Sequence, residues 1–90
     1  MESAWFLYIL RCKDDTLYTG ITTDVEKRFQ QHCLGKGAKY TRGRGPLTLV
    51  YQETCADHSE ALKREAYIKG LTRAQKEALL MGMASSYSKN

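Results

Sequence analysis

Hydrophobic and polar positions along the chain predict two strands, a helix, a third strand and two further helices. Residues 5–12 and 17–22 are rich in aromatic and branched side chains, and the polar residues 13–16 between them indicate a hairpin connection. Residues 47–54, after Pro46, form a third run of the same kind. This order predicts an α/β (α+β) fold, a single small domain in which helices flank a three-stranded, mainly antiparallel sheet.

Capping motifs mark the beginning of each predicted helix. Thr23-Asp-Val-Glu26 has the spacing of a capping box, in which Thr23 accepts hydrogen bonds from first-turn amides and Glu26 reaches back to the backbone. Asp57-His-Ser-Glu60 is a second such box, and Thr72-Arg-Ala-Gln75 begins the last helix. The three helices are expected to end at about Leu34, at Gly70 and at about Met83.

Length and composition are those of one ordinary globular domain. Ninety residues leave little room for a second hydrophobic core, so residues 1–83 are expected to form one domain and residues 84–90 a flexible C-terminal tail. The chain is 42% apolar and 27% charged, and no apolar run approaches the roughly eighteen residues of a membrane span. No signal peptide is expected from the first residues, and the cysteines at 12, 33 and 55 match neither a disulfide framework nor paired metal ligands. These features predict a cytoplasmic protein.

One glutamate lies on the side of its predicted helix that should face the core. At about 100° per residue, residues 59–71 gather an apolar arc, and Glu65 projects from the middle of it. The arc comprises Ala61, Leu62, Ala66 and Ile68. A buried carboxylate without a partner costs several kcal/mol, so we expect a cation beside Glu65.

The first helix presents a cation and an imidazole beside its apolar stripe. Val25, Phe29 and Cys33 form the stripe, and Arg28 and His32, four residues apart, follow one edge of it. Taken alone, such a pair is more often a solvated helix margin than a site.

A basic loop, residues 35–45, follows this helix. It has several glycines and no acidic residue, and its cations are Lys36, Lys39, Arg42 and Arg44. Backbone amides and long cationic side chains can both reach a polyanion, so the loop is either a phosphate-contacting surface or a solvated segment that binds nothing specific. Tyr40, in the same loop, either stacks on a base or anchors the loop.

Two tripeptides on the predicted hairpin connect these features. Phe6-Leu7-Tyr8 on the first strand and Tyr18-Thr19-Gly20 on the second resemble the paired motifs of the GIY-YIG nuclease superfamily. Residues 26–32 resemble the helix that carries that family's arginine and histidine, residues 37–44 its basic loop, and Glu65 its metal-binding glutamate. The resemblance extends over nearly the whole chain and is closest to the small stand-alone bacterial members of the YhbQ type.

The sequence departs from the family pattern at two positions. Phe6 stands where the first motif has glycine, and Thr19 replaces a branched aliphatic residue of the second. Neither position supplies a functional side chain, so the site is expected to survive.

The resemblance implies a site that hydrolyses phosphodiester bonds. Glu65 would bind one divalent cation, Mg²⁺ or Mn²⁺, as a hard oxygen ligand. Arg28 would pair with phosphate oxygens through its rigid fork. Tyr8, with His32 as second choice, would orient or deprotonate the attacking water, although a tyrosine of ordinary pKa is a poor base at neutral pH. Tyr18 would hydrogen-bond a phosphate oxygen or a water.

The remaining implied contacts concern the substrate backbone. Gly20 would leave room for it, and the cations of the basic loop, together with Tyr40, would contact it. For Tyr8 and Tyr18 to share one face of the sheet, paired residues on the two strands must have numbers with an even sum. That register requires a three- or five-residue connection, or a bulge.

We therefore expect a metal-dependent DNA endonuclease with a role in DNA repair or processing. The alternative is a nucleic-acid-binding module that has the same fold and little or no catalytic activity. An RNA substrate stays open, as does the preferred nucleic-acid structure. No membrane partner is expected, and since no appended targeting domain is recognised, a protein partner for targeting is compatible with the sequence.

Overall fold

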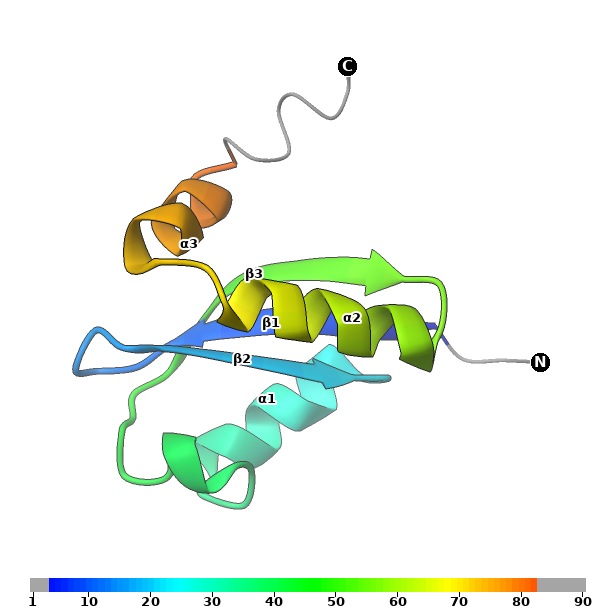
Figure 1. The fold of residues 1–90 in the computed structure, drawn as a ribbon. Helices are drawn as coiled ribbons and strands as arrows, with labels where there is room; N and C mark the ends of the chain where they lie inside the picture. The colour runs from blue at the N-terminus through cyan, green and yellow to red at the C-terminus, as the bar shows by residue number, and fades with distance from the viewer. Residues whose placement is uncertain (1–3, 83–90) are drawn as a thin grey trace.

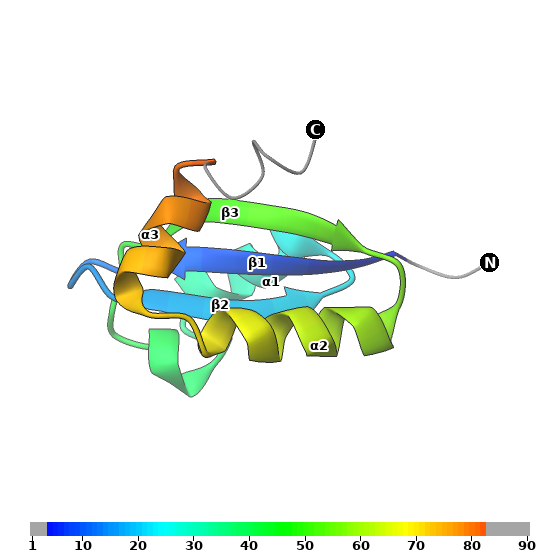
Figure 2. The same cartoon turned by 45° about the horizontal axis from the view of Figure 1, so that its top comes forward.

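A three-stranded antiparallel sheet with the order β2-β1-β3 separates α1 on one face from α2 and α3 on the other (Figure 1; Figure 2). The computed structural model describes residues 4–82. Its elements are β1 (Trp5–Arg11), β2 (Leu17–Thr22), α1 (Val25–Cys33), the short 3₁₀ helix η1 (Lys39–Thr41), β3 (Thr48–Cys55), α2 (His58–Lys69) and α3 (Arg73–Leu80).

The predicted order of elements and the antiparallel sheet are both confirmed. The ends of the elements differ slightly from the prediction, because β1 ends at Arg11, β3 begins at Thr48, and α3 ends at Leu80 rather than at about Met83. Met83 and the predicted tail, 84–90, lie outside the described residues. Within residues 4–82, no helix has the length and apolar character needed to cross a membrane.

The central strand β1 is buried on both faces, which explains its continuous apolar run. Leu7 and Ile9 are fully buried on the face covered by α2 and α3. Tyr8 and Leu10 point to the opposite face and pack against side chains of α1. One strand therefore supplies both halves of the core and also positions Tyr8.

The register of the hairpin places both predicted tyrosines on one face of the sheet. Tyr8 pairs with Gly20, two residues from Tyr18, so the numbers of paired residues have an even sum, as predicted. The strand ends are joined by five residues, 12–16, which also matches the prediction. Asp15 has φ +70°, the left-handed conformation that a glycine usually supplies in such a loop.

Two of the three predicted N-caps are confirmed. The Asp57 side chain caps α2, and Thr72 caps α3 within a complete capping box. The prediction for α1 is wrong by one residue, because the carboxylate of Asp24, not the hydroxyl of Thr23, accepts the amide of Lys27 at 3.0 Å.

Candidate active site on the α1 face of the sheet

The hydroxyl of Tyr8 is the centre of the candidate site. It lies 2.8 Å from Nε2 of His32 on α1. The Arg28 guanidinium and the Tyr18 side chain are close enough to this hydroxyl to affect its pKa. Ring centroids are 6.3 Å apart for Tyr8 and Tyr18 and 5.3 Å apart for Tyr18 and His32. The structure thus brings together four of the five predicted catalytic residues, which we name the Tyr8 cluster: Tyr8, Tyr18, Arg28 and His32.

The imidazole of His32 has polar contacts at both ring nitrogens. Nδ1 lies 2.8 Å from the Thr41 hydroxyl, and the Ala38 amide donates to it at 3.3 Å. The Thr41 hydroxyl in turn donates to the Ala38 carbonyl at 2.9 Å. The helix stripe predicted to contain Cys33 contains His32 instead, since His32 is 2% exposed and Cys33 is exposed. A hydropathy pattern cannot anticipate this exchange, because the basic loop supplies the partners that make a histidine stable in the interior.

Two glycines provide the space that these rings occupy. A Cβ at Gly20 would lie 2.6 Å from the Tyr8 hydroxyl oxygen, and a Cβ at Gly37 would lie 2.2 Å from Nδ1 of His32. Neither distance is compatible with a side-chain carbon. Gly20 therefore shapes the site through Tyr8, while its predicted contact with the substrate backbone stays a prediction.

Burial favours the uncharged forms of both Tyr8 and His32. Desolvation first, and Tyr18 second, raise the pKa of Tyr8 to about 12, although Arg28 acts in the opposite direction. Desolvation, followed by the charge of Arg28, lowers the pKa of His32 below its ordinary value. At neutral pH the free protein therefore presents a protonated phenol beside a neutral imidazole.

The basic loop folds over the site instead of extending into solvent. Tyr40 stacks on Tyr18, with ring centroids 5.8 Å apart and 24° between the ring planes. The guanidinium carbon of Arg44 lies 4.3 Å from the centroid of Tyr40, and its Nη1 pairs with Asp14 of the hairpin connection at 2.5 Å. Of the two interpretations of Tyr40, the structure shows the loop anchor, and base stacking stays a prediction.

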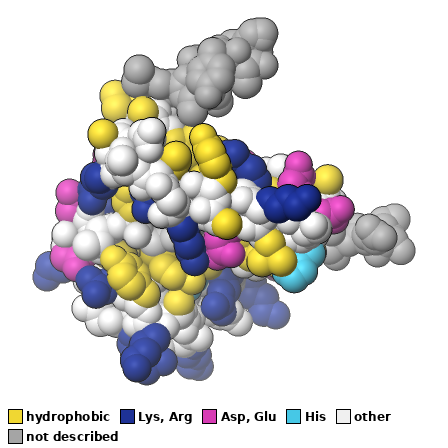
Figure 3. All heavy atoms as spheres, viewed as in Figure 1, with side chains coloured by type: hydrophobic (Ala, Val, Ile, Leu, Met, Phe, Trp, Pro, Cys, Tyr) yellow, Lys and Arg dark blue, Asp and Glu magenta, His cyan; other side chains and the backbone are white. Residues whose placement is uncertain are grey.

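Three cations of the basic loop remain available to a ligand. Lys36, Lys39 and Arg42 are exposed, and no described residue forms an ion pair or a side-chain hydrogen bond with any of them. In the view of Figure 3, Lys and Arg side chains gather on the lower part of the molecule, over α1 and η1. Arg44 differs from these three because its charge is already paired.

Glu65, the fifth predicted catalytic residue, makes its contacts elsewhere. It lies on the sheet-facing side of α2, one turn from the fully buried Ala61 and Ile68, and its side chain is 20% exposed. Its carboxylate pairs with Lys69, one turn further along α2, at 3.2 Å. The divalent cation predicted beside Glu65 stays a prediction. Within residues 4–82, Glu65 forms no hydrogen bond or ion pair with the Tyr8 cluster.

The apolar arc predicted around Glu65 is partly wrong. Leu62 is 45% exposed and Ala66 is also exposed, so neither belongs to the buried stripe. Arg64, which is not part of the predicted arc, is partly buried and pairs with Glu53 of β3 at 2.6 Å. Helical periodicity could not reveal this rotation of the stripe, because it depends on a carboxylate that lies on a separate strand.

Glu65 lies on α2, which covers the face of the sheet opposite to the Tyr8 cluster, and it is the metal ligand predicted from the sequence. No group of three or more His, Cys, Asp or Glu side chains that could hold a metal ion occurs within residues 4–82. Mg²⁺ is commonly bound through one or two carboxylates, with waters and substrate phosphates completing its shell. Glu65 therefore fits a hard cation that arrives with the substrate better than one held in a preformed cage.

Three supporting residues were not predicted from the sequence: Gly37, Thr41 and Asp14. Gly37 and Thr41 act on His32 from a loop that has no periodic pattern, so only their position in the basic loop hinted at a role. Asp14 was interpreted as a turn residue, and its carboxylate does accept hydrogen bonds from Thr16. Its contact with Arg44 spans 30 positions and has no local signal.

Comparison with known proteins places this arrangement among relatives. Residues 4–78 match the family model described as the GIY-YIG catalytic domain. The chain is 59% identical over 78 residues to a UPF0213 protein of Cronobacter sakazakii, covering 87% of this chain and 82% of that protein. It is 58% identical over 76 residues to the UPF0213 protein YhbQ of Escherichia coli, covering 84% of this chain and 76% of that protein.

Two solved structures share the fold. The solution NMR structure of the UPF0213 protein BH0048 from Bacillus halodurans is 49% identical, with a TM-score of 0.58, and the match covers 87% of this chain and 83% of that one. The solution NMR structure of the protein EF2693 from E. faecalis is 40% identical, with a TM-score of 0.63, and the match covers 92% and 88%. The small sheet-and-helix domain seen here is therefore common to these proteins.

Proposed function

The chain belongs to the GIY-YIG family, and on that premise we propose that it is a divalent-metal-dependent endonuclease that hydrolyses phosphodiester bonds in DNA. The observation that supports this most directly is the convergence of Tyr18, Arg28 and His32 on the Tyr8 hydroxyl. A water that attacks a phosphate must lose its proton, and negative charge builds on the phosphate. The Tyr8 cluster offers a hydroxyl and an imidazole for the first need and a guanidinium for the second.

The proton of the attacking water passes, in this proposal, through Tyr8 to His32. A phenol with a pKa of about 12 is not ionised at neutral pH, so Tyr8 accepts a proton only while it gives its own away. When Nδ1 of His32 carries the ring proton, it donates to Thr41, and Nε2 is free to accept the Tyr8 proton across 2.8 Å. This tautomer gives up the contact with the Ala38 amide, which at 3.3 Å is the longest of the three.

The carbonyl of Ala38 supports the charged state that follows. Once His32 holds two protons, its Nδ1–H donates to the Thr41 hydroxyl, which donates on to the Ala38 carbonyl at 2.9 Å. Tyr8 therefore contacts the water, and His32 is the base that retains the proton. The ordinary objection to a tyrosine base at neutral pH does not apply to this arrangement, because no tyrosinate has to exist before the attack.

Arg28 binds the phosphate that is cleaved, and the basic loop binds its neighbours. Arg28 lies beside the Tyr8 hydroxyl and donates to Gln31 through one nitrogen at 3.0 Å, which leaves other donors of the fork for phosphate oxygens. Lys36, Lys39 and Arg42 are exposed on the adjoining loop, where each would meet a phosphate of the flanking backbone.

Glu65 is the residue that would hold Mg²⁺ or Mn²⁺. When bound, such a cation polarises a phosphate oxygen and stabilises the departing alkoxide. The ion pair with Lys69 keeps this partly buried carboxylate neutralised in the free protein. A role in DNA repair or processing, and a protein partner that directs the enzyme to its target, belong to the same proposal.

Burial of the central pair favours a second candidate, a nucleic-acid-binding module with little or no catalytic activity. Tyr8 is 1% exposed and His32 is 2% exposed, so neither side chain reaches solvent in the free protein. If both rings stay buried when nucleic acid binds, they belong to the core, and the basic loop alone contacts the backbone.

A panel of labelled DNA and RNA structures, incubated with and without Mg²⁺ or Mn²⁺, tests the proposal. Tyr8→Phe removes the central hydroxyl, and we expect cleavage to fall by orders of magnitude while binding persists. Tyr51→Phe is the matched control, because burial first and Glu53 second raise the pKa of Tyr51 to about 12 as well, but its ring packs on the α2 face beside Ile9. Binding without cleavage by the wild type would favour the module, and equal loss in both variants would contradict the role of Tyr8.

A further inference from the structure

We propose that the carboxylate of Asp14 pairs with the guanidinium of Arg44 in the free protein, and that a backbone phosphate replaces this carboxylate when nucleic acid binds. Arg44 then becomes a phosphate-binding residue of the site, and Asp14 the residue that sets how readily it binds. This inference rests on the proposed function. The two side chains, joined by the 2.5 Å contact between Nη1 and Oδ2, are 36% and 48% exposed, so a ligand can reach both.

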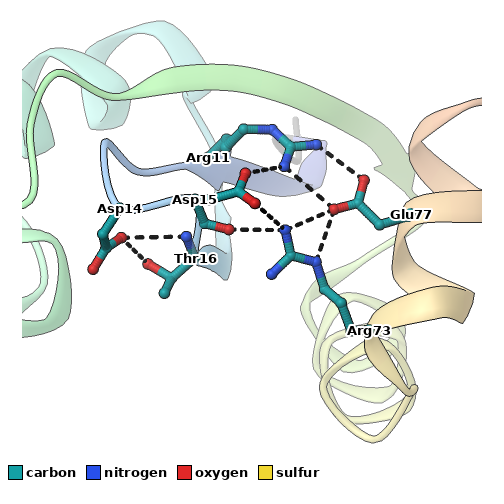
Figure 4. Close-up of polar contacts among 6 residues, drawn as sticks. All are labelled: Arg11, Asp14, Asp15, Thr16, Arg73 and Glu77. Atoms are coloured by element: carbon teal, nitrogen blue, oxygen red, sulfur yellow. Dashed lines mark hydrogen bonds and ion pairs between the residues drawn. The ribbon is translucent and has the colours of Figure 1, made fainter.

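Asp15, the neighbour of Asp14, has different partners, and their contacts hold parts of the fold together. Asp15 pairs with Arg11 at 2.7 Å and with Arg73 of α3 at 3.2 Å. Both arginines also pair with Glu77 of α3, at 3.0 and 2.7 Å, so four alternating charges tie α3 to the hairpin connection (Figure 4). Among the described residues, neither arginine forms a side-chain hydrogen bond or ion pair with the basic loop.

Asp14 points away from that network, as Figure 4 shows. Its Oδ1 accepts hydrogen bonds from the amide and the hydroxyl of Thr16, at 3.2 and 2.6 Å. Its Oδ2 is the atom that pairs with Arg44. One oxygen therefore holds the turn, and the other is placed where a phosphate oxygen would lie against the guanidinium.

Arg44 is fixed by contacts that do not involve the Asp14 carboxylate. Its carbonyl accepts the amide of Lys13 at 2.9 Å, and its amide donates to the carbonyl of Thr41 at 3.1 Å. Its guanidinium also lies 4.3 Å from the Tyr40 centroid. Loss of the Asp14 charge should therefore leave Arg44 in place with an unpaired charge.

The position of Arg44 suits a phosphate next to the one that is cleaved. Tyr40, which the guanidinium covers, stacks on Tyr18, and the Tyr18 ring is 5.3 Å from that of His32. Ion pairs as exposed as this one are weak in water. A polyanion whose other phosphates are already held by the free cations of the basic loop can therefore displace the carboxylate.

The exchange has a distinctive dependence on salt. An unpaired arginine that binds a phosphate releases a condensed counterion from the nucleic acid. An arginine that must first release a carboxylate leaves that carboxylate free to bind a cation from solution. This uptake of one cation cancels the release of one counterion from the nucleic acid. The wild type should therefore lack the contribution of Arg44 to the salt dependence, and a variant without the Asp14 charge should regain it.

Binding of a labelled single-stranded DNA, followed by fluorescence anisotropy from about 50 to about 200 mM salt without divalent cation, tests the exchange. Asp14→Asn removes the charge and keeps the oxygen that Thr16 uses. Glu26→Gln is the matched control, because the exposed Glu26 has no ion-pair partner among the described residues and its loss changes the net charge equally. We expect Asp14→Asn to bind about fivefold more tightly than Glu26→Gln at low salt, with a slope of log affinity against log salt steeper by about 0.7.

The double variant Asp14→Asn/Arg44→Gln distinguishes the exchange from a general effect of removing one negative charge. The increase in affinity and slope expected for Asp14→Asn should vanish in it, because Arg44 is absent. Equal affinity and slope for Asp14→Asn and Glu26→Gln would overturn the proposal, as would a gain that survives in the double variant. Weaker binding by Asp14→Asn would also overturn it and would show that Asp14 positions Arg44. Arg44→Gln alone, which leaves the turn intact, should not alter the slope of the wild type. Failure of the wild type to bind any nucleic acid would refute the proposed function itself, a result distinct from these.

Discussion

Gly37 is the position at which a single added methyl group should damage the site most. A Cβ there would lie 2.2 Å from Nδ1 of His32 and 2.7 Å from two of its ring carbons. The ring and the loop would have to separate by roughly 1 Å to restore ordinary contact, since a packed interior has little slack. A retreat of that size stretches the 2.8 Å contacts of His32 with Tyr8 and Thr41 beyond hydrogen-bonding distance. We expect Gly37→Ala to lower the free energy of unfolding by about 1–3 kcal/mol.

Thermal unfolding and cleavage rate together test this reasoning. Each kcal/mol should lower the thermal midpoint by about 4–8 °C in a domain of this size, and cleavage should fall about a hundredfold because the imidazole is misplaced. Gly70→Ala is the matched control, since a Cβ at Gly70 meets only backbone oxygens at 3.5 and 3.6 Å and its φ is −84°. If Gly37→Ala were as stable and as active as Gly70→Ala, the loop would not confine His32 and the reasoning would be refuted.

Three further predictions concern the metal ligand, the basic loop and the imidazole. Glu65→Gln should reduce cleavage in Mg²⁺ by orders of magnitude without lowering the thermal midpoint; full activity would rule out the metal ligand, and collapse of the fold would make Glu65 a structural ion-pair member. Changing Lys39 and Arg42 together to alanine should flatten the salt dependence of affinity by about 0.7 to 0.9 of log–log slope per lost contact, and an unchanged slope would remove both from the interface. Because burial lowers the pKa of His32 in the folded state, its contribution to stability is present above the ordinary value of 6.5 and is lost as the pH falls toward the folded pKa. The thermal midpoint should therefore fall on acidification from about pH 7 to about pH 5, and less so in His32→Gln; equal falls would contradict the assignment.

Features that depend on residues close together in the sequence were predictable from it. The caps Asp57 and Thr72 act within their own first turns, and the parity of the hairpin follows from the alternation of strand side chains. The N-cap of α1 could not be predicted from the local sequence alone. Thr23 and Asp24 can both accept a first-turn amide, and the choice depends on the path of the chain, in which the Thr22 hydroxyl accepts the Asp24 amide at 3.1 Å.

The candidate site was predictable in its residues but not in its environment. Motif resemblance and helical spacing selected the Tyr8 cluster, which the structure does bring together, while the catalytic roles of its members stay predictions. Burial of His32 could not be predicted, because it depends on Thr41 in a loop without periodicity. The ion pair of Arg44 likewise links segments 30 positions apart, and only the folded chain shows that this cation is already occupied.

The five-residue hairpin connection also restricts which insertions and deletions the segment between β1 and β2 can tolerate. Successive strand side chains point to opposite faces, so one residue inserted or deleted between Arg11 and Leu17 would turn Tyr18 away from Tyr8. A change of two residues would keep both tyrosines on the α1 face. Insertions and deletions tolerated in this hairpin should therefore come in even numbers, unless a bulge elsewhere in β2 restores the parity.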